Sequence, residues 1–204
     1  MTALTNAVPR KLTVAVTGAS GSIFPKHLLA ALEQDERVST VNLILSDSGL
    51  RVMAEELGLS GRTELVSKLL GHPPVKIQQQ NNNDIGANVA SGSYATDAMI
   101  VLPCSVGTLA RIANGMAIHL IERAADVCLK ENRPLVLCVR ETPFNRIHLR
   151  NMTLAAEAGA TIFPVIPAFY FHPASTDDIA REFVNRVLAH IGLPQAGAYQ
   201  WKAE

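Results

Sequence analysis

The chain has 204 residues, of which 48% are hydrophobic and 18% are charged, and its 18 basic side chains balance 18 acidic ones. This length suits one sizeable α/β domain and is short for two, and the balanced charge leaves no global field to hold nucleic acid or an anionic membrane. The hydrophobic content predicts apolar surface buried between subunits. We expect one domain over residues 1–204, with a flexible lead-in at 1–10 and a C-terminal tail at 195–204.

The cysteines and the chain ends indicate a cellular location. Cys104, Cys128 and Cys138 lie in apolar stretches without the spacing of a metal or redox motif, which predicts reduced core thiols and no metal site. The sequence shows no charged-then-apolar leader and no apolar run of membrane-spanning length. We therefore expect a cytoplasmic protein.

The first predicted strand is an apolar, β-branched run at residues 12–16, which ends in small residues and is followed by a helical pattern. This order predicts a buried parallel strand, a tight loop and a helix. Gly18 and Gly21 would let a ligand approach the backbone N–H groups, and the helix N-terminus favours an anion, so the loop suits phosphate. The dinucleotide pattern G-x-G-x-x-G is incomplete, because Ser20 and Ile23 take glycine positions, and a plain tight turn stays the alternative.

A second strand is predicted at residues 41–45, followed by a helix that contains Glu56. Asp47 could bind the ribose of a nicotinamide cofactor, but Ser46-Asp47-Ser48 before a helical pattern is more often an N-cap, which we favour. Residues 58–97 are the least regular. They predict a short helix through 65–69, a possible strand at 75–77 and an exposed polar excursion at 78–83.

A third buried strand, at residues 98–102, again leads into small hydroxyl residues ahead of a helix at 109–113. Two such loops at the carboxyl edge of one sheet define a crevice, where the ligands of open α/β sheets bind. Ser105 and Thr108 could hydrogen-bond a flavin ring or a phosphate. Helix capping is the alternative for each.

The helix predicted at residues 120–131 places Glu122 and Arg123 among apolar neighbours. They are therefore either paired at a subunit contact or turned into the crevice. Lys130, near the helix C-terminus, can bind an anion or simply complement the helix dipole.

A strand at residues 134–139 ends in Arg140 and Glu141, charges that suit the open edge of a sheet better than its interior. Arg140 can grip a phosphate or a flavin carbonyl with its planar fork, and Glu141 beside an anion can donate or accept a proton. An Arg–Glu pair that only holds the loop is the alternative.

The last third of the chain predicts a helix at 147–158, a strand at 160–163 and a helix at 176–191 that carries Arg186. Between them, residues 169–171 are consecutive aromatics, which build a wall of an apolar pocket with the Tyr170 hydroxyl as its polar tip. Trp201, the only tryptophan, lies in the tail.

Six motifs carry a resemblance to a known family. They are Gly18-Ala19-Ser20-Gly21, Ala90-Ser91-Gly92-Ser93, Pro103-Cys104-Ser105 with Gly107-Thr108, Glu122-Arg123-Ala124-Ala125-Asp126-Val127 with Leu129-Lys130-Glu131, Arg140-Glu141-Thr142-Pro143, and Phe169-Tyr170. In this order they resemble the UbiX family of flavin prenyltransferases from about residue 13 to residue 194. The resemblance implies a flavin-binding α/β domain with a Rossmann-like, three-layer α/β/α fold and a mostly parallel sheet, as in HFCD-like flavoproteins.

The implied activity is transfer of a dimethylallyl group from dimethylallyl phosphate to N5 and C6 of reduced FMN, without a metal. The product, prenylated FMN, would serve a separate UbiD-type decarboxylase. Members of the family form homo-oligomers, typically dodecamers, which agrees with the apolar composition.

The resemblance also implies roles for individual residues. FMN contacts would fall on Gly18, Ala19, Ser20, Ser46, Ser105, Val106, Gly107, Thr108 and Arg140. Contacts to the prenyl phosphate would fall on Lys130, Arg140, Tyr170 and Arg186, with Arg123 and Glu141 supplied at a subunit interface and Trp201 closing the site. Ser20, Glu56 and Glu141 would handle protons, Glu56 as the base for the ring proton, while Lys130 and the arginines stabilise the leaving phosphate.

This chain departs from the family pattern at Phe24-Pro25, where Tyr-Gly is usual, and its sequence at residues 78–89 also differs from that pattern. Two alternatives share the fold. One is a flavin-dependent cysteine-type decarboxylase, for which His72 would have to act as the base although its Gly-His-Pro setting is poor. The other is a non-catalytic FMN carrier.

Overall fold

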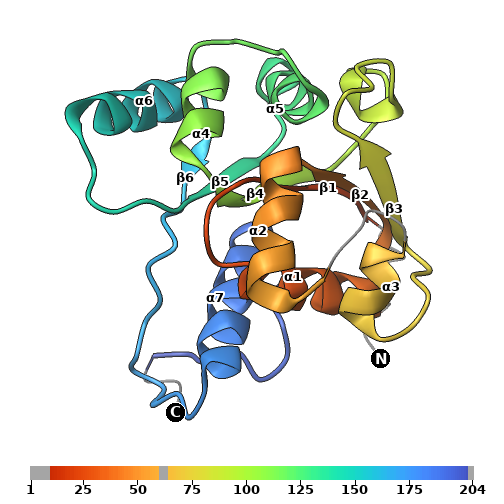
Figure 1. Cartoon of the computed structure of the whole chain (residues 1–204), viewed down its shortest axis with the longest axis vertical. Coiled ribbons are helices and arrows are strands. Elements are labelled where there is room, and N and C mark those ends of the chain that lie inside the picture. Colours follow the sequence, from red (N-terminus) through yellow and green to blue (C-terminus); the bar gives the residue numbers. More distant parts are fainter. Residues whose placement is uncertain (1–9, 60–63, 202–204) are drawn as a thin grey trace, which may run out of the picture.

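The computed structural model describes residues 10–59 and 64–201, which form a six-stranded sheet between two layers of helices (Figure 1). The strands are β1 Arg10–Val16, β2 Val38–Leu45, β3 Ile77–Asn81, β4 Ala98–Cys104, β5 Leu135–Val139 and β6 Thr161–Ile162. Their order is β3-β2-β1-β4-β5-β6, and every neighbouring pair is parallel. The chain order reverses between β1 and β4, so the crevice of this sheet lies at the carboxyl ends of these two strands.

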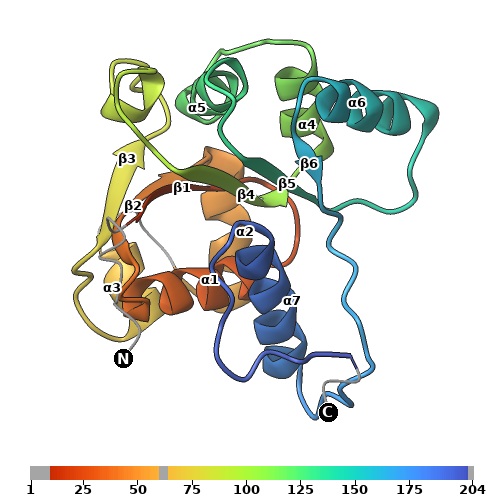
Figure 2. The same cartoon turned by 180° about the vertical axis from the view of Figure 1, so that it is seen from behind.

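The helices are α1 Ile23–Gln34, α2 Asp47–Leu57, α3 Leu65–Leu70, α4 Val106–Ala113, α5 Leu120–Lys130, α6 Arg146–Glu157 and α7 Thr176–His190, with a 3-10 turn at Asn88–Ala90. Helices α1, α2, α3 and α7 lie on one side of the sheet and α4, α5 and α6 on the other, as the two opposite views show (Figures 1 and 2). This is the expected three-layer α/β/α fold.

Each face of the sheet has its own hydrophobic core. Val14 and Ile100 pack with α1 and α7 on one side, while Ala15 and Val101 pack with α4 and α5 on the other. The central strands are buried on both faces, which explains why they read as continuous apolar runs rather than as an alternation. The three cysteines are buried and free, as predicted. Burial raises the pKa of the Cys104 thiol to about 12 and that of Cys128 to about 11.

The polar run at 78–83 corrects one expectation. Residues 78–81 are not a loop excursion but most of β3, the edge strand, which pairs in register with β2. Backbone hydrogen bonds to β2 hold the strand. Because β3 is the last strand of the sheet, its polar side chains stay largely exposed. Gln80 also donates a hydrogen bond of 3.3 Å to the side chain of Asn42 on β2.

Arg10 and the Phe24-Pro25 departure fit the fold without disruption. Of the expected lead-in only Arg10 is described; it begins β1 and donates to the carbonyl of Ile191, 2.5 Å away. Pro25 fits the first turn of α1, and Phe24 packs edge-to-face on Phe183 of α7, with ring centroids 5.1 Å apart.

The described residues contain neither a membrane-spanning helix nor a cluster of metal ligands. In the described ranges, no helix is both long and apolar enough to cross a bilayer. Nor do residues 10–59 and 64–201 contain a cluster of three or more potential metal ligands.

Candidate active site

The ends of β1, β4 and β5 are tied together by Thr17 and by backbone hydrogen bonds. The Thr17 hydroxyl donates to the carbonyl of Pro103 at 2.8 Å and accepts from the N–H of Ser105 at 2.8 Å. The N–H of Arg140 donates to the carbonyl of Cys104 at 3.0 Å. The two loops predicted to form the crevice therefore lie side by side, and Arg140 leaves the sheet next to them. Sequence patterns do not indicate this role of Thr17, because Pro103 lies 86 residues away.

The first loop packs tightly against the start of α2. A Cβ on Gly18 would lie 2.4 Å from the Cβ of Ser48, so only glycine fits there. Ser46 caps α2 by accepting from the N–H of Gly49, and its hydroxyl lies 3.1 Å from that of Ser48. The capping interpretation of Ser46 is thus confirmed.

Glu56 holds the same loop from the far end of α2. Its carboxylate accepts hydrogen bonds from the N–H of Gly21 at 3.0 Å and of Ser22 at 2.6 Å. Burial raises the pKa of Glu56, but hydrogen bonds from the Ser20 side chain and from these N–H groups outweigh burial and leave it below its ordinary value. The structure thus joins Ser20 and Glu56, both predicted to handle protons, and keeps the carboxyl group ionised.

The second loop is organised by a hydroxyl pair and an ion pair. Ser105 caps α4, and its hydroxyl donates to that of Thr108 at 3.1 Å. Arg111 donates to the Thr108 hydroxyl at 3.2 Å and to the buried carboxylate of Glu122 at 2.6 Å. Glu122 is thus paired within its own chain, with an arginine that also contacts the second loop. Arg111 precedes Glu122 by 11 residues and lies on another helix, so no pattern in the sequence predicts this pair.

Arg140 and Glu141 line a cavity of about 290 Å³ together with Phe144 and Ile166. Across the described ranges, no ion pair joins Arg140 to Glu141 or to any other carboxylate. Among the described residues, the Glu141 carboxylate accepts a hydrogen bond only from the N–H of Thr142, at 2.9 Å. The alternative of a purely structural Arg–Glu pair is therefore wrong, and the Arg140 guanidinium is available to an anionic ligand.

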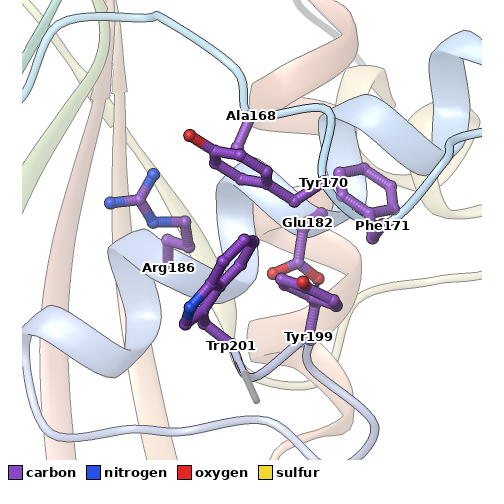
Figure 3. Close-up of a pocket in the computed structure, with 7 residues that line it drawn as sticks. All are labelled: Ala168, Tyr170, Phe171, Glu182, Arg186, Tyr199 and Trp201. Atoms are coloured by element: carbon purple, nitrogen blue, oxygen red, sulfur yellow. Dashed lines mark hydrogen bonds between the residues drawn. The ribbon is translucent and has the colours of Figure 1, made fainter.

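A second cavity, of about 410 Å³, lies between α7, the aromatic loop and the C-terminal tail (Figure 3). Tyr170 and Trp201 meet there edge-to-face, with ring centroids 4.9 Å apart, and Arg186 points its side chain into the same region. Arg186 also lies over the ring of Phe163 at 6.0 Å. Ile166 lines the Arg140 cavity and a neighbouring cavity shared by Tyr170, Arg186 and Trp201, so the two regions adjoin.

Two predicted phosphate ligands lie elsewhere in the protomer. Lys130 ends α5 and pairs with Glu131, close to Gly92, at the amino ends of the strands. Arg123 donates to the carbonyl of Ala90 and to Asp126 at 2.6 Å. Since the crevice is at the carboxyl ends, Lys130 cannot reach the crevice of its own chain.

The residues at the crevice fit a flavin that carries a phosphate. Helices α1, α2 and α4 all begin at this edge, and the first N–H groups of a helix have no acceptor within it. A Cβ on Gly107 would meet only Arg111, at 3.7 Å, so the first turn of α4 is open. The Arg140 guanidinium adds positive charge, while the charge of Glu56 is compensated by its hydrogen-bond donors.

Comparison with known proteins agrees with this geometry. A sequence model of the flavoprotein family matches residues 2–187. The flavin prenyltransferase UbiX of Pseudomonas aeruginosa is 42% identical over 199 residues, which cover 95% of this chain and 94% of that protein. The chain belongs to the UbiX family of flavin prenyltransferases.

Solved structures of UbiX proteins share the fold. AnUbiX (PadA1), in complex with FMN and dimethylallyl pyrophosphate, superposes with a TM-score of 0.85 at 39% identity, covering 96% of this chain and 98% of that one. A dodecameric FMN-dependent UbiX-like decarboxylase from Escherichia coli O157:H7 gives a TM-score of 0.83 at 40% identity, covering 95% and 100%. The predicted fold class and family are thereby confirmed.

Proposed function

We propose that this chain transfers the dimethylallyl group of dimethylallyl phosphate to reduced FMN at the crevice between β1 and β4. The proposal is carried by one observation: Arg140 leaves the sheet beside the Ser105 loop, without an ion-pair partner in the described ranges, and lines a cavity that adjoins the one around Arg186. Two guanidinium groups that have no ion pair with any described residue, next to an open loop, suit a phosphate ester held against a flavin.

The first and second loops would hold FMN. Gly18, Ala19 and Ser20 would border the ring on one side, and Ser46 would lie at the start of α2. Val106, Gly107 and Thr108 would offer the open N-terminus of α4, with Ser105 beside them. Reduced FMN would supply two nucleophilic atoms: N5 would displace the phosphate, and C6 would then bond to the other end of the allyl group, with the double bond taking up the proton that N5 loses. Glu56, ionised and close to Ser20, would accept the ring proton.

The donor phosphate would lie between Arg140 and Arg186, with the Tyr170 hydroxyl as a further donor. These groups would stabilise the negative charge that grows on the phosphate as the carbon–oxygen bond breaks, and Glu141 would supply a proton to it. The faces of Tyr170 and Trp201 would shelter the allylic carbon and exclude water.

Lys130 and Arg123 would complete the phosphate site from a neighbouring subunit. Lys130 lies at the edge of the sheet opposite the crevice, so only another copy can bring it to the phosphate. We propose a homo-oligomer, a dodecamer, in which each crevice meets α5 of a neighbour, and delivery of prenylated FMN to a UbiD-type decarboxylase.

The cysteine-type decarboxylase alternative is disfavoured by the position of His72. This residue lies in the exposed turn between α3 and β3, at the amino ends of the strands, and its Nδ1 is 3.0 Å from the carbonyl of Pro73. His72→Asn should therefore leave prenyl transfer unchanged. An FMN carrier would give no reason for Arg140, Glu141 and Arg186 to surround adjoining cavities.

The test is an anaerobic incubation of the purified protein with reduced FMN and dimethylallyl phosphate, with the diphosphate in a separate arm. We expect the mass spectrum of the extracted flavin to show one added five-carbon unit. Unmodified flavin in both arms, with FMN still bound, would favour the carrier. Decarboxylation of a cysteinyl peptide instead would favour the decarboxylase.

A further inference from the structure

Glu182 and Arg186 stand one helical turn apart on α7, in the i, i+4 spacing at which a glutamate and an arginine ordinarily pair. Yet no ion pair between them occurs in the described structure. The Glu182 carboxylate instead accepts hydrogen bonds from the N–H of Tyr199 and from the side chain of Asn185, each at 3.2 Å.

The C-terminal tail therefore engages the carboxylate. Figure 3 shows the Glu182 carboxylate directed toward Tyr199, while the Arg186 guanidinium points away from it. The guanidinium rests over Phe163 instead, 6.0 Å from the ring centroid. Both side chains line the cavity that Tyr170 and Trp201 also line.

We propose that Glu182 is a positioning residue whose carboxylate is held by the backbone N–H of Tyr199, which leaves Arg186 free to bind the phosphate of the prenyl donor. When the tail leaves this position, Glu182 loses its acceptor role, turns to Arg186 and competes with the phosphate for the guanidinium. Docking of the tail and binding of the donor thus favour each other. This inference rests on the proposed role of Arg186 in donor binding.

The test removes the N–H of the tail that donates to the Glu182 carboxylate. Tyr199→Pro deletes this donor, and we expect the Kd for dimethylallyl phosphate, titrated by calorimetry against the FMN-loaded protein, to rise about three- to fivefold, the range of one exposed ion pair. Glu182→Gln alone should change the Kd by less than about twofold, because a neutral amide does not compete for the guanidinium.

The decisive variant is the double substitution. Adding Glu182→Gln to Tyr199→Pro should restore the Kd, although the tail stays displaced, and the emission of Trp201, the only tryptophan, should remain that of the single Tyr199→Pro variant. The matched control adds Glu157→Gln, on the exposed end of α6, to Tyr199→Pro. It removes the same charge far from the cavity and should leave the Kd as high as in Tyr199→Pro alone.

Two results would overturn the inference: a double variant as weak as Tyr199→Pro, or an unchanged Kd in Tyr199→Pro. Both results come from binding measurements, so they do not depend on the mass spectrum of the flavin that tests the proposed function. Native protein that binds dimethylallyl phosphate without prenylating FMN would refute the proposed function and leave the role of Glu182 standing.

Discussion

Arg140 and Glu56 both lie at the crevice, but they differ in what they bind. Arg140 has no ion-pair partner in the described ranges, whereas the carboxylate of Glu56 is engaged by the loop between β1 and α1. A substitution of Arg140 should therefore act on ligand binding, and one of Glu56 on both the loop and the chemistry.

Arg140→Ala should weaken binding of FMN and dimethylallyl phosphate about tenfold or more, or ~1.4 kcal/mol, because a planar, unpaired guanidinium is lost. The midpoint of thermal unfolding should stay unchanged, since no internal ion pair breaks. Flavin fluorescence titration and a thermal melt would measure the two. Arg150→Ala, on the exposed face of α6, is the control for charge, and equal weakening there would contradict the prediction.

Glu56→Gln should lower the free energy of unfolding by up to about 1 kcal/mol at pH 7, because a charged acceptor of loop N–H groups is replaced by a neutral one at an exposed position that water screens. The pKa of Glu56 is lower in the folded protein, so its contribution is present above the ordinary value of 4.5 and is lost as the pH falls through the folded value. Urea titrations should show native protein and variant converging in acid. A gap of the same size in acid as at pH 7 would argue against this origin.

At the level of elements, the crevice depends on how closely the two loops approach α2 and α4. Ser46 caps α2, as its position before a helical pattern predicted, and Ser105 caps α4, which is the alternative to its predicted ligand contact. Periodicity also predicted the strands with few errors, because burial on both faces leaves a strong apolar signal. It placed β3 at 75–77, too early in the chain, because the polar residues of Ile77–Asn81 are held by backbone pairing that no side-chain pattern records.

Gly18→Ala should destabilise the fold by about 1 to 3 kcal/mol and weaken FMN binding, since its Cβ would clash with Ser48 at 2.4 Å. Ser48→Gly in the same chain removes the clashing atoms and should recover part of the stability. Chemical denaturation of the single and double variants measures this. If the two losses simply add, the clash is not the cause.

Lys130 lies at the amino ends of the strands and Arg140 at their carboxyl ends. If the active site is shared between copies, oligomers that mix two variants should regain activity. Lys130→Ala and Arg140→Ala should each be inactive alone, but their co-expression should yield about a quarter of native sites, because some crevices would combine the intact residue of each copy. Prenyl transfer by the purified mixed oligomer is the measurement.

Co-expression of Lys130→Ala with Arg123→Ala is the matched control. Both residues lie on α5, so every neighbour would donate one defect, and activity should stay low. Activity in this control equal to that of the first mixture would mean that the two α5 residues come from different copies.

The sequence by itself determined the repeated units of strand, loop and helix, the capping serines and the concentration of charge at Arg140 and Glu141. These are local features, since burial, helix caps and the polarity of a strand end are set by residues close in the chain. Its motifs also identified the family and the residues to test.

Only the tertiary structure decided which of these residues meet. Strand order brought Thr17 to Ser105, helix packing paired Arg111 with Glu122, and the path of α2 carried Glu56 to the first loop. Strand direction put Lys130 at the far edge, and the tail drew Glu182 away from Arg186. Such contacts join distant segments through their packing, and no spacing along the chain encodes them.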